Sequence, residues 1–200
     1  MVIRTVEEVE KIREVIRYNA DVVFEQLKAK SENIEAVSFL KYIKFERVGL
    51  DPVEGTELNF IEQLNQTFSD LVVLEGVRHL LLEYPEKEWK LNLGSASGFD
   101  IESVDGEVVA ECFAATVSTS NRKLDKDCLK LMDKATGQKK YICFYTHYDS
   151  DEKIQRIFNK YPGATLRSPQ TMTPFVLPSA SAFAASPHRY ARKSSSHFIL

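Results

Sequence analysis

The chain has 200 residues, of which 44 % are hydrophobic and 28 % are charged, a balance typical of a globular protein with one principal domain. Its apolar runs are far shorter than the ~20 residues that a membrane-spanning helix needs, and its N-terminus is acidic where a secretory signal would be apolar. The three cysteines, Cys112, Cys128 and Cys143, lack the spacing of a zinc site or a disulfide framework. We therefore expect a cytoplasmic protein with reduced thiols and no membrane segment.

Charge is distributed unevenly along the chain. Four basic residues and no acidic residue follow residue 165, so the first 165 residues hold 22 basic and 29 acidic residues, a net charge of −7. An acidic body does not favour a nucleic-acid surface. The segment 166–200 also contains four of the seven prolines in a background of serine and alanine. This composition predicts a disordered tail.

The N-terminal segment is predicted to be helical. Apolar residues recur at steps of three and four over residues 5–30, and Thr5 with Glu8 fits a capping box. Residues 35–50 favour a second helix, although their aromatic residues also allow a strand. A break follows at Pro52. We therefore predict a helical extension over residues 1–54, with homodimer packing through its long first helix.

A second long helix is predicted from near Thr56 to about Leu82. Its expected apolar stripe consists of Ile61, Leu64, Phe68, Leu71 and Val72. Glu57 precedes Ile61 by one helical turn. We therefore expect Glu57 at the N-terminal end of the buried stripe rather than on the solvated face.

The hydrophobic period then changes from that of a helix to that of a strand. Alternating residues predict a strand over 89–93, and Asp105-Gly106 predicts a hairpin turn between strands at 99–104 and 107–117. The pattern further predicts a helix over 123–135, a buried strand over 139–148 and a short helix over 151–161. The fold class is therefore mixed α/β (α+β), with a helix–strand–strand–strand–helix–strand core over residues 55–165.

Two acidic residues lie on the two arms of the expected hairpin. If the register brings Asp100 opposite Glu111, two carboxylates meet at one edge of the sheet, beside the small-residue turn at 94–98. Carboxylate oxygens in an incomplete shell suit Mg²⁺ when a phosphate supplies the remaining ligands. Acids beside glycine-rich turns are also commonly exposed or bonded to local amides, and both interpretations remain open.

The order of these elements, with SGFDI on the second strand and VVAECFA on the third, resembles the PD-(D/E)XK nuclease superfamily, whose fold is called restriction-endonuclease-like. The resemblance covers about residues 55–148. It implies that Asp100 and Glu111 are the two motif acids and that the main-chain carbonyl of Cys112 is a third metal contact. It also implies a first-helix acid, for which Glu57 is the first choice and Glu62 the second.

The chain departs from the family pattern at the motif lysine, which is replaced by Phe113. Some members of the superfamily supply this lysine from the following helix. By this resemblance Lys123, or as second choice Lys126, would hold the attacking water. A solvated residue in the first helical turn accounts for Lys123 equally well.

The resemblance implies a Mg²⁺- or Mn²⁺-dependent endonuclease that hydrolyses phosphodiester bonds of DNA. An alternative is a catalytically inactive protein that retains the nuclease fold as a scaffold for protein or nucleic-acid partners. The replacement at Phe113 and the acidic body favour this alternative, whereas the Asp100 and Glu111 pair favours the enzyme. A third interpretation is an unrelated α+β domain whose carboxylates have no catalytic role.

Overall fold

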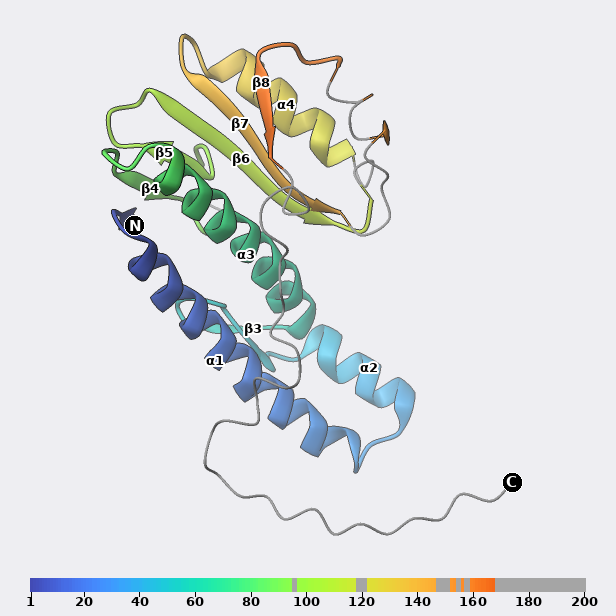
Figure 1. Cartoon of the computed structure of the whole chain (residues 1–200). Helices are drawn as coiled ribbons and strands as arrows, with labels where there is room; N and C mark the ends of the chain where they lie inside the picture. Colours follow the sequence, from blue (N-terminus) through green and yellow to red (C-terminus); the bar gives the residue numbers. More distant parts are fainter. Residues whose placement is uncertain (95–96, 118–121, 147–151, 154–155, 157–158, 168–200) are drawn as a thin grey trace.

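A computed structural model describes residues 1–94, 97–117, 122–146, 152–153, 156 and 159–167. The described residues form a mixed α/β structure with four helices and two sheets (Figure 1). The helices are α1 (Val6–Ser31), α2 (Ala36–Phe45), α3 (Phe60–Glu83) and α4 (Lys123–Lys134). The main sheet contains β1 (Val2–Ile3), β4 (Trp89–Leu91), β5 (Ile101–Ser103), β6 (Val108–Ala115), β7 (Lys139–Thr146) and β8 (Ala164–Arg167). The small sheet pairs β2 (Gly49–Leu50) with β3 (Glu57–Leu58).

The main sheet is covered by helices on both faces. Its strand order is β1-β4-β5-β6-β7-β8, antiparallel from β1 to β6 and parallel from β6 to β8. Helix α3 packs on one face, and α4 connects β6 to the parallel strand β7 across the other face (Figure 1). The elements α3, β4, β5, β6, α4 and β7 thus follow the order predicted from the sequence, including the hairpin turn at Asp105-Gly106.

Two hydrophobic clusters fill the spaces on either side of the sheet. Strand β6 contributes to both, because successive side chains of a strand point to opposite faces. The cluster on the α3 side includes Leu74, Val77, Ile101, Ala110 and Cys112. The cluster on the α4 side includes Val109, Phe113, Leu124, Leu131 and Phe144.

The N-terminal segment joins the same structure rather than standing apart from it. Helix α1 begins with the predicted capping box, in which Thr5 and Glu8 bond each other's backbone amides. Strand β1 pairs with β4, and Ile3 and Val9 belong to the hydrophobic cluster on the α3 side of the sheet. The predicted extension over 1–54 and the predicted core over 55–165 therefore share one hydrophobic interior.

The start of α3 differs from the prediction. The helix begins at Phe60, where Asn59 and Glu62 form a capping box, and Glu57 lies exposed in β3. The expected helical start was wrong because residues 49–58 form the β2–β3 hairpin instead. The expected apolar stripe was also wrong over its first half, where Leu64 and Phe68 are 41 % exposed. The N-terminal part of α3 extends beyond the sheet toward α2 (Figure 1), and Leu64 and Phe68 border an open groove at the end of the sheet instead of being buried.

The C-terminal part of the described chain adds β8, which the sequence did not predict. This strand pairs in parallel with β7 and crosses the expected boundary between residues 165 and 166. The helix expected over 151–161 lies partly outside the described residues. The disordered tail expected over 166–200 was wrong for residues 166 and 167, which belong to β8, and its remainder lies outside the described residues. No described helix is both long enough and apolar enough to cross a membrane.

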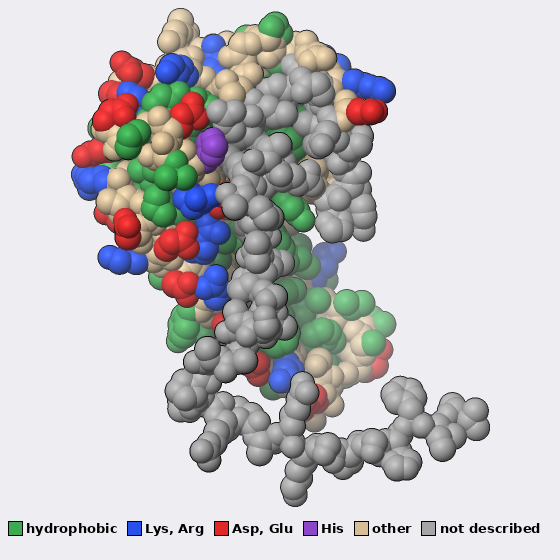
Figure 2. Space-filling model, viewed as in Figure 1, with side chains coloured by type: hydrophobic (Ala, Val, Ile, Leu, Met, Phe, Trp, Pro, Cys, Tyr) green, Lys and Arg blue, Asp and Glu red, His purple; other side chains and the backbone are tan. Residues whose placement is uncertain are grey.

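Acidic and basic side chains are interspersed on the described surface that faces the viewer in Figure 2. This view shows no broad basic stripe of the kind that tracks a nucleic-acid backbone.

Gly76 allows α3 to approach the sheet closely. A Cβ atom at this position would lie 2.9 Å from Cys143 Sγ and 3.1 Å from Ile101 Cδ1. We expect Gly76→Ala to lower the free energy of unfolding by about 1–2 kcal/mol, because overpacking outweighs the gain of about 1 kcal/mol in helix propensity. Chemical denaturation measures this change.

The same substitution in a Cys143→Ala background is the control. Removing the sulfur makes room for the new methyl group, so Gly76→Ala should then destabilise the protein less. A net stabilisation by Gly76→Ala in the otherwise unchanged chain would contradict the close approach.

Candidate functional site: acidic residues between two helices

The β5–β6 hairpin places the two predicted acids opposite each other. Ile101 pairs with Ala110 in this antiparallel ladder, so the next pair in the same register is Asp100 and Glu111. Directly opposed residues of antiparallel strands project from the same face of the sheet. The hairpin predicted from the sequence therefore brings the two carboxylates to neighbouring positions.

Asp100 is fixed by the backbone of β6. Its Oδ2 accepts a hydrogen bond from the main-chain N–H of Cys112 at 2.6 Å, a short bond of the charge-assisted kind. A strand residue presents its N–H and C=O to the same neighbouring strand. We therefore expect the main-chain carbonyl of Cys112, the predicted third metal contact, to face the β5 side, where Asp100 lies.

Glu111 is paired with a lysine that the sequence analysis missed. The Glu111 side chain is 1 % exposed, and its Oε1 lies 2.6 Å from Lys130 Nζ on α4. Lys130 also donates to the main-chain oxygen of Gly98 at 2.5 Å, so it links α4 to the turn before Asp100. Lys130 is about two helical turns after Lys123, and this spacing is the sequence signal that could have identified it.

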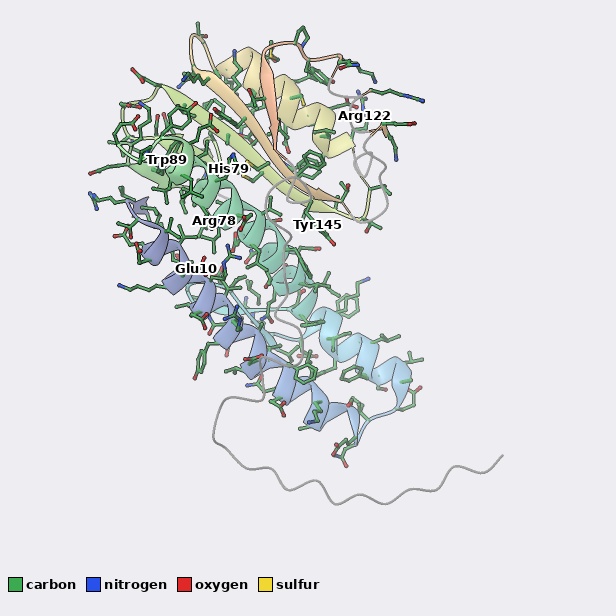
Figure 3. All side chains as sticks on the ribbon, in the orientation of Figure 1. Glu10, Arg78, His79, Trp89, Arg122 and Tyr145 are labelled. Atoms are coloured by element: carbon green, nitrogen blue, oxygen red, sulfur yellow. The ribbon has the colours of Figure 1, made fainter. Side chains whose placement is uncertain are left out.

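Lys123 also reaches the acidic region, as predicted. It begins α4 directly after Arg122 (Figure 3) and lines a pocket that also contains Asp100. Its Nζ donates to Asp127 Oδ1 at 2.6 Å, one turn further along the helix. Lys126, the second choice, is exposed and does not line this pocket.

The acid that α3 contributes is Asp70, not either of the predicted residues. Glu57 lies outside the helix, and Glu62 is part of its N-terminal cap. Asp70 is 4 % exposed and lines the same pocket as Asp100 and Lys123. An acid in phase with Val73 and Val77, on the face that α3 buries, is the sequence signal for Asp70.

Asp70, Asp100 and Lys123 meet at a polar pocket of about 260 Å³ between α3, the β4–β5 connection, β6 and the start of α4, whereas Glu111 and Lys130 are not among its lining residues. Its walls include Ser69, Asp70, Asn92, Asp100, Cys112 and Lys123. The pocket therefore combines carboxylate oxygens, an amide side chain and a lysine, all of which can contact a cation or a phosphate group.

Burial and mutual repulsion alter the protonation of the acids. Burial, with added repulsion from Asp51 and Asp100, raises the pKa of Asp70 to about 7. Burial and the nearby Asp100 likewise raise the pKa of Glu111 to about 7, although Lys130 opposes the shift. The pKa of Asp100 is raised by burial, against the opposing effects of the Cys112 amide and the two lysines. Asp70 and Asp100 line the pocket, and Glu111 interacts with Asp100. Carboxylates with perturbed pKa values are typical of functional sites.

The position of the expected motif lysine belongs to the hydrophobic interior. Phe113 is 2 % exposed, and its ring stacks on Phe144 with centroids 5.7 Å apart. It packs with α4 residues in the cluster on that side of the sheet. The only cations that the described residues bring to these acids from α4 are therefore those of Lys123 and Lys130.

The donor chemistry fits a hard cation. In the described part of the chain, no group of three or more His, Cys, Asp or Glu side chains converges in a way that could hold a metal ion. Mg²⁺, however, often takes only one or two protein carboxylates and completes its shell with water and substrate phosphate. The opposed pair Asp100 and Glu111, with Asp70 beside the same pocket, fits that requirement.

Comparisons of the chain with family models, with curated proteins and with solved structures found no match. The functional argument therefore rests on the geometry and chemistry of the chain itself.

The raised pKa of Asp70 predicts a stability that depends on pH. Asp70 binds its proton more tightly in the folded state, so it lowers the stability progressively as the pH rises from about 4 to about 7. Asp70→Asn removes this charge and keeps an oxygen acceptor. We expect it to raise the free energy of unfolding by about 1–3 kcal/mol near pH 8, with a smaller gain near pH 5. Urea denaturation at both pH values measures the difference.

Asp133→Asn on the exposed surface of α4 is the matched control and should change stability little at either pH. Equal stability of the Asp70→Asn variant and the unaltered protein at high pH would show that Asp70 is not a strained buried acid.

Proposed function

We propose that the chain is a Mg²⁺- or Mn²⁺-dependent nuclease that hydrolyses phosphodiester bonds of DNA and has a restriction-endonuclease-like fold. The observation that carries the proposal is the opposed pair formed by the half-buried Asp100, directly before β5, and the buried Glu111 on β6, accompanied by Lys130 from α4. The order of elements around this pair supports the proposal, because Asp100 directly precedes the second strand and Glu111 lies on the third strand of a helix–strand–strand–strand–helix–strand unit.

The acids and the backbone would form the metal side of the site. Asp100 and Glu111, together with the main-chain carbonyl of Cys112, would hold the ion, and Asp70 lies at the adjoining pocket wall. When bound, such an ion polarises a phosphoryl oxygen and lowers the pKa of a coordinated water. Asp70, which takes the place expected for Glu57 or Glu62, would accept a hydrogen bond from water in the pocket.

The lysines of α4 would stabilise charge on the phosphate and hold the second motif acid in position. Burial lowers the pKa of Lys123, but its hydrogen bond to Asp127 and the nearby Asp100 and Glu111 outweigh that effect, so the pKa is raised. Lys123 therefore stays protonated at neutral pH and can stabilise the charge that develops on the transferred phosphoryl group. Lys130, already bonded to Glu111 and Gly98, would hold the second motif acid in place.

A catalytically inactive scaffold is the second candidate. The observation that favours it is the burial of Phe113 at the expected lysine position, together with the excess of acidic residues. The two candidates differ in one property, since only the nuclease requires the two motif acids for turnover. The homodimer through α1 and the cytoplasmic location stay predictions.

A cleavage assay tests the proposal. Purified protein with Mg²⁺ or Mn²⁺ should cut plasmid or single-stranded DNA, and chelation of the metal should stop the reaction. We expect Asp100→Asn and Glu111→Gln each to lower the rate more than about 100-fold, since even residues behind metal ligands change activity 10- to 100-fold. Gel electrophoresis of the products measures the rate.

Glu102→Gln is the matched control, because this half-exposed acid lies on β5 two residues from Asp100. It should retain nearly full activity. Absence of metal-dependent cleavage by the unaltered protein on every DNA form, with no calorimetric Mg²⁺ or Mn²⁺ binding, would leave the scaffold.

A further inference from the structure

An apolar groove adjoins the acidic pocket at the end of the sheet. Its volume is about 440 Å³, within the range of sites that bind small organic groups. Its walls include Leu64, Asn65, Phe68, Ala114, Thr116 and Tyr145. Phe68 comes from α3 and Tyr145 from the C-terminal part of β7, where Figure 3 labels it. Two aromatic rings therefore border one cavity from different elements.

The groove is continuous with the proposed catalytic site. Ala114 lines both the groove and the acidic pocket. It follows Cys112 by two residues, a span of roughly 7 Å along a strand. A ligand whose phosphate lies beside Asp100 would thus place its neighbouring group in the groove.

We propose that this groove binds a nucleobase of a single-stranded nucleic acid whose phosphate occupies the acidic pocket, an inference that rests on the proposed nuclease function. Aromatic side chains stack on the faces of bases without regard to sequence. The amide of Asn65 and the hydroxyl of Thr116 supply hydrogen-bonding groups for a base edge. The substrate class is therefore an unpaired strand rather than an intact duplex.

The charge of the protein supports the same choice of substrate. Duplex binding draws most of its non-specific affinity from basic residues on the phosphate backbone, whereas the first 165 residues here carry a net charge of −7. An acidic protein can still retain a strand if base stacking supplies the affinity. The groove offers that contact beside the site of the proposed chemistry.

Phe68 is well suited to substitution because it is 41 % exposed and contributes little to the interior. Fluorescence anisotropy would follow a labelled single-stranded DNA oligonucleotide, and the same strand annealed to its complement. The buffer would contain Ca²⁺, and a gel would show that the strand stays intact. We expect the unaltered protein to bind the single strand more tightly than the duplex, and Phe68→Ala to weaken single-strand binding by about 5- to 100-fold.

Two further variants separate base stacking from general apolar contact. Phe68→Trp should preserve binding, and the fluorescence of the introduced indole should fall when the strand is added. Phe68→Leu, which keeps apolar bulk without an aromatic face, should bind as weakly as Phe68→Ala. Phe45→Ala removes an aromatic ring that is 67 % exposed on α2, outside the groove, and should leave binding unchanged.

The result that overturns this inference is single-strand binding that is undetectable, or equal for Phe68→Leu and the unaltered protein. The latter would show that the strand does not depend on the aromatic face of Phe68. If the protein cleaves DNA in a metal-dependent way but Phe68→Ala does not weaken single-strand binding, the groove is not the base-binding site and the proposed nuclease function stands. If the strand quenches the indole fluorescence of the Phe68→Trp variant but the unaltered protein cleaves no DNA, the proposed nuclease function is wrong and the groove is a single-strand binding site.

Discussion

The site depends on three desolvated acids, of which Asp100 acts on both of the others, Asp70 and Glu111. Each loses water on folding, and burial raises the pKa of all three. The fold offsets this cost only in part, with the Cys112 amide for Asp100 and Lys130 for Glu111. A hydrophobic interior of this kind would be more stable with apolar residues at these positions. The nuclease that we propose would account for burying acids at this cost.

Glu75, a buried acid on α3 like Asp70, is an example of a carboxylate with a structural role. Glu75 is 5 % exposed, yet Arg13 and Arg78 bond it at 3.1 and 2.7 Å. Although burial raises the pKa of Glu75, the two arginines outweigh that effect and hold it below its usual value. Arg78 lies between α1 and α3 (Figure 3), so this cluster joins two helices. Asp70, only five residues away, faces other carboxylates instead.

The sequence predicted the parts of the site that depend on local pattern. The Asp105-Gly106 turn and the alternation of β6 determine the hairpin, and the hairpin determines that Asp100 faces Glu111. Glu57 was misplaced because the pairing of β2 with β3 is a tertiary choice that helix periodicity does not contain. Strands β1 and β8 were missed for the same reason, since each is short and defined only by its neighbour in the sheet.

The position of the lysines follows from the period of a strand. Glu111 and Phe113 are two residues apart, so they project from the same face of β6, and that face is covered by α4. Phe113 packs with Phe144 and Leu124 on that face and also borders the acidic pocket, where it supplies no cation. Because α4 packs on the same face of the sheet, Lys123 and Lys130 on this helix lie close enough to interact with Asp100, and Lys130 also pairs with Glu111. Helix α4 can therefore supply the lysine that β6 lacks at position 113.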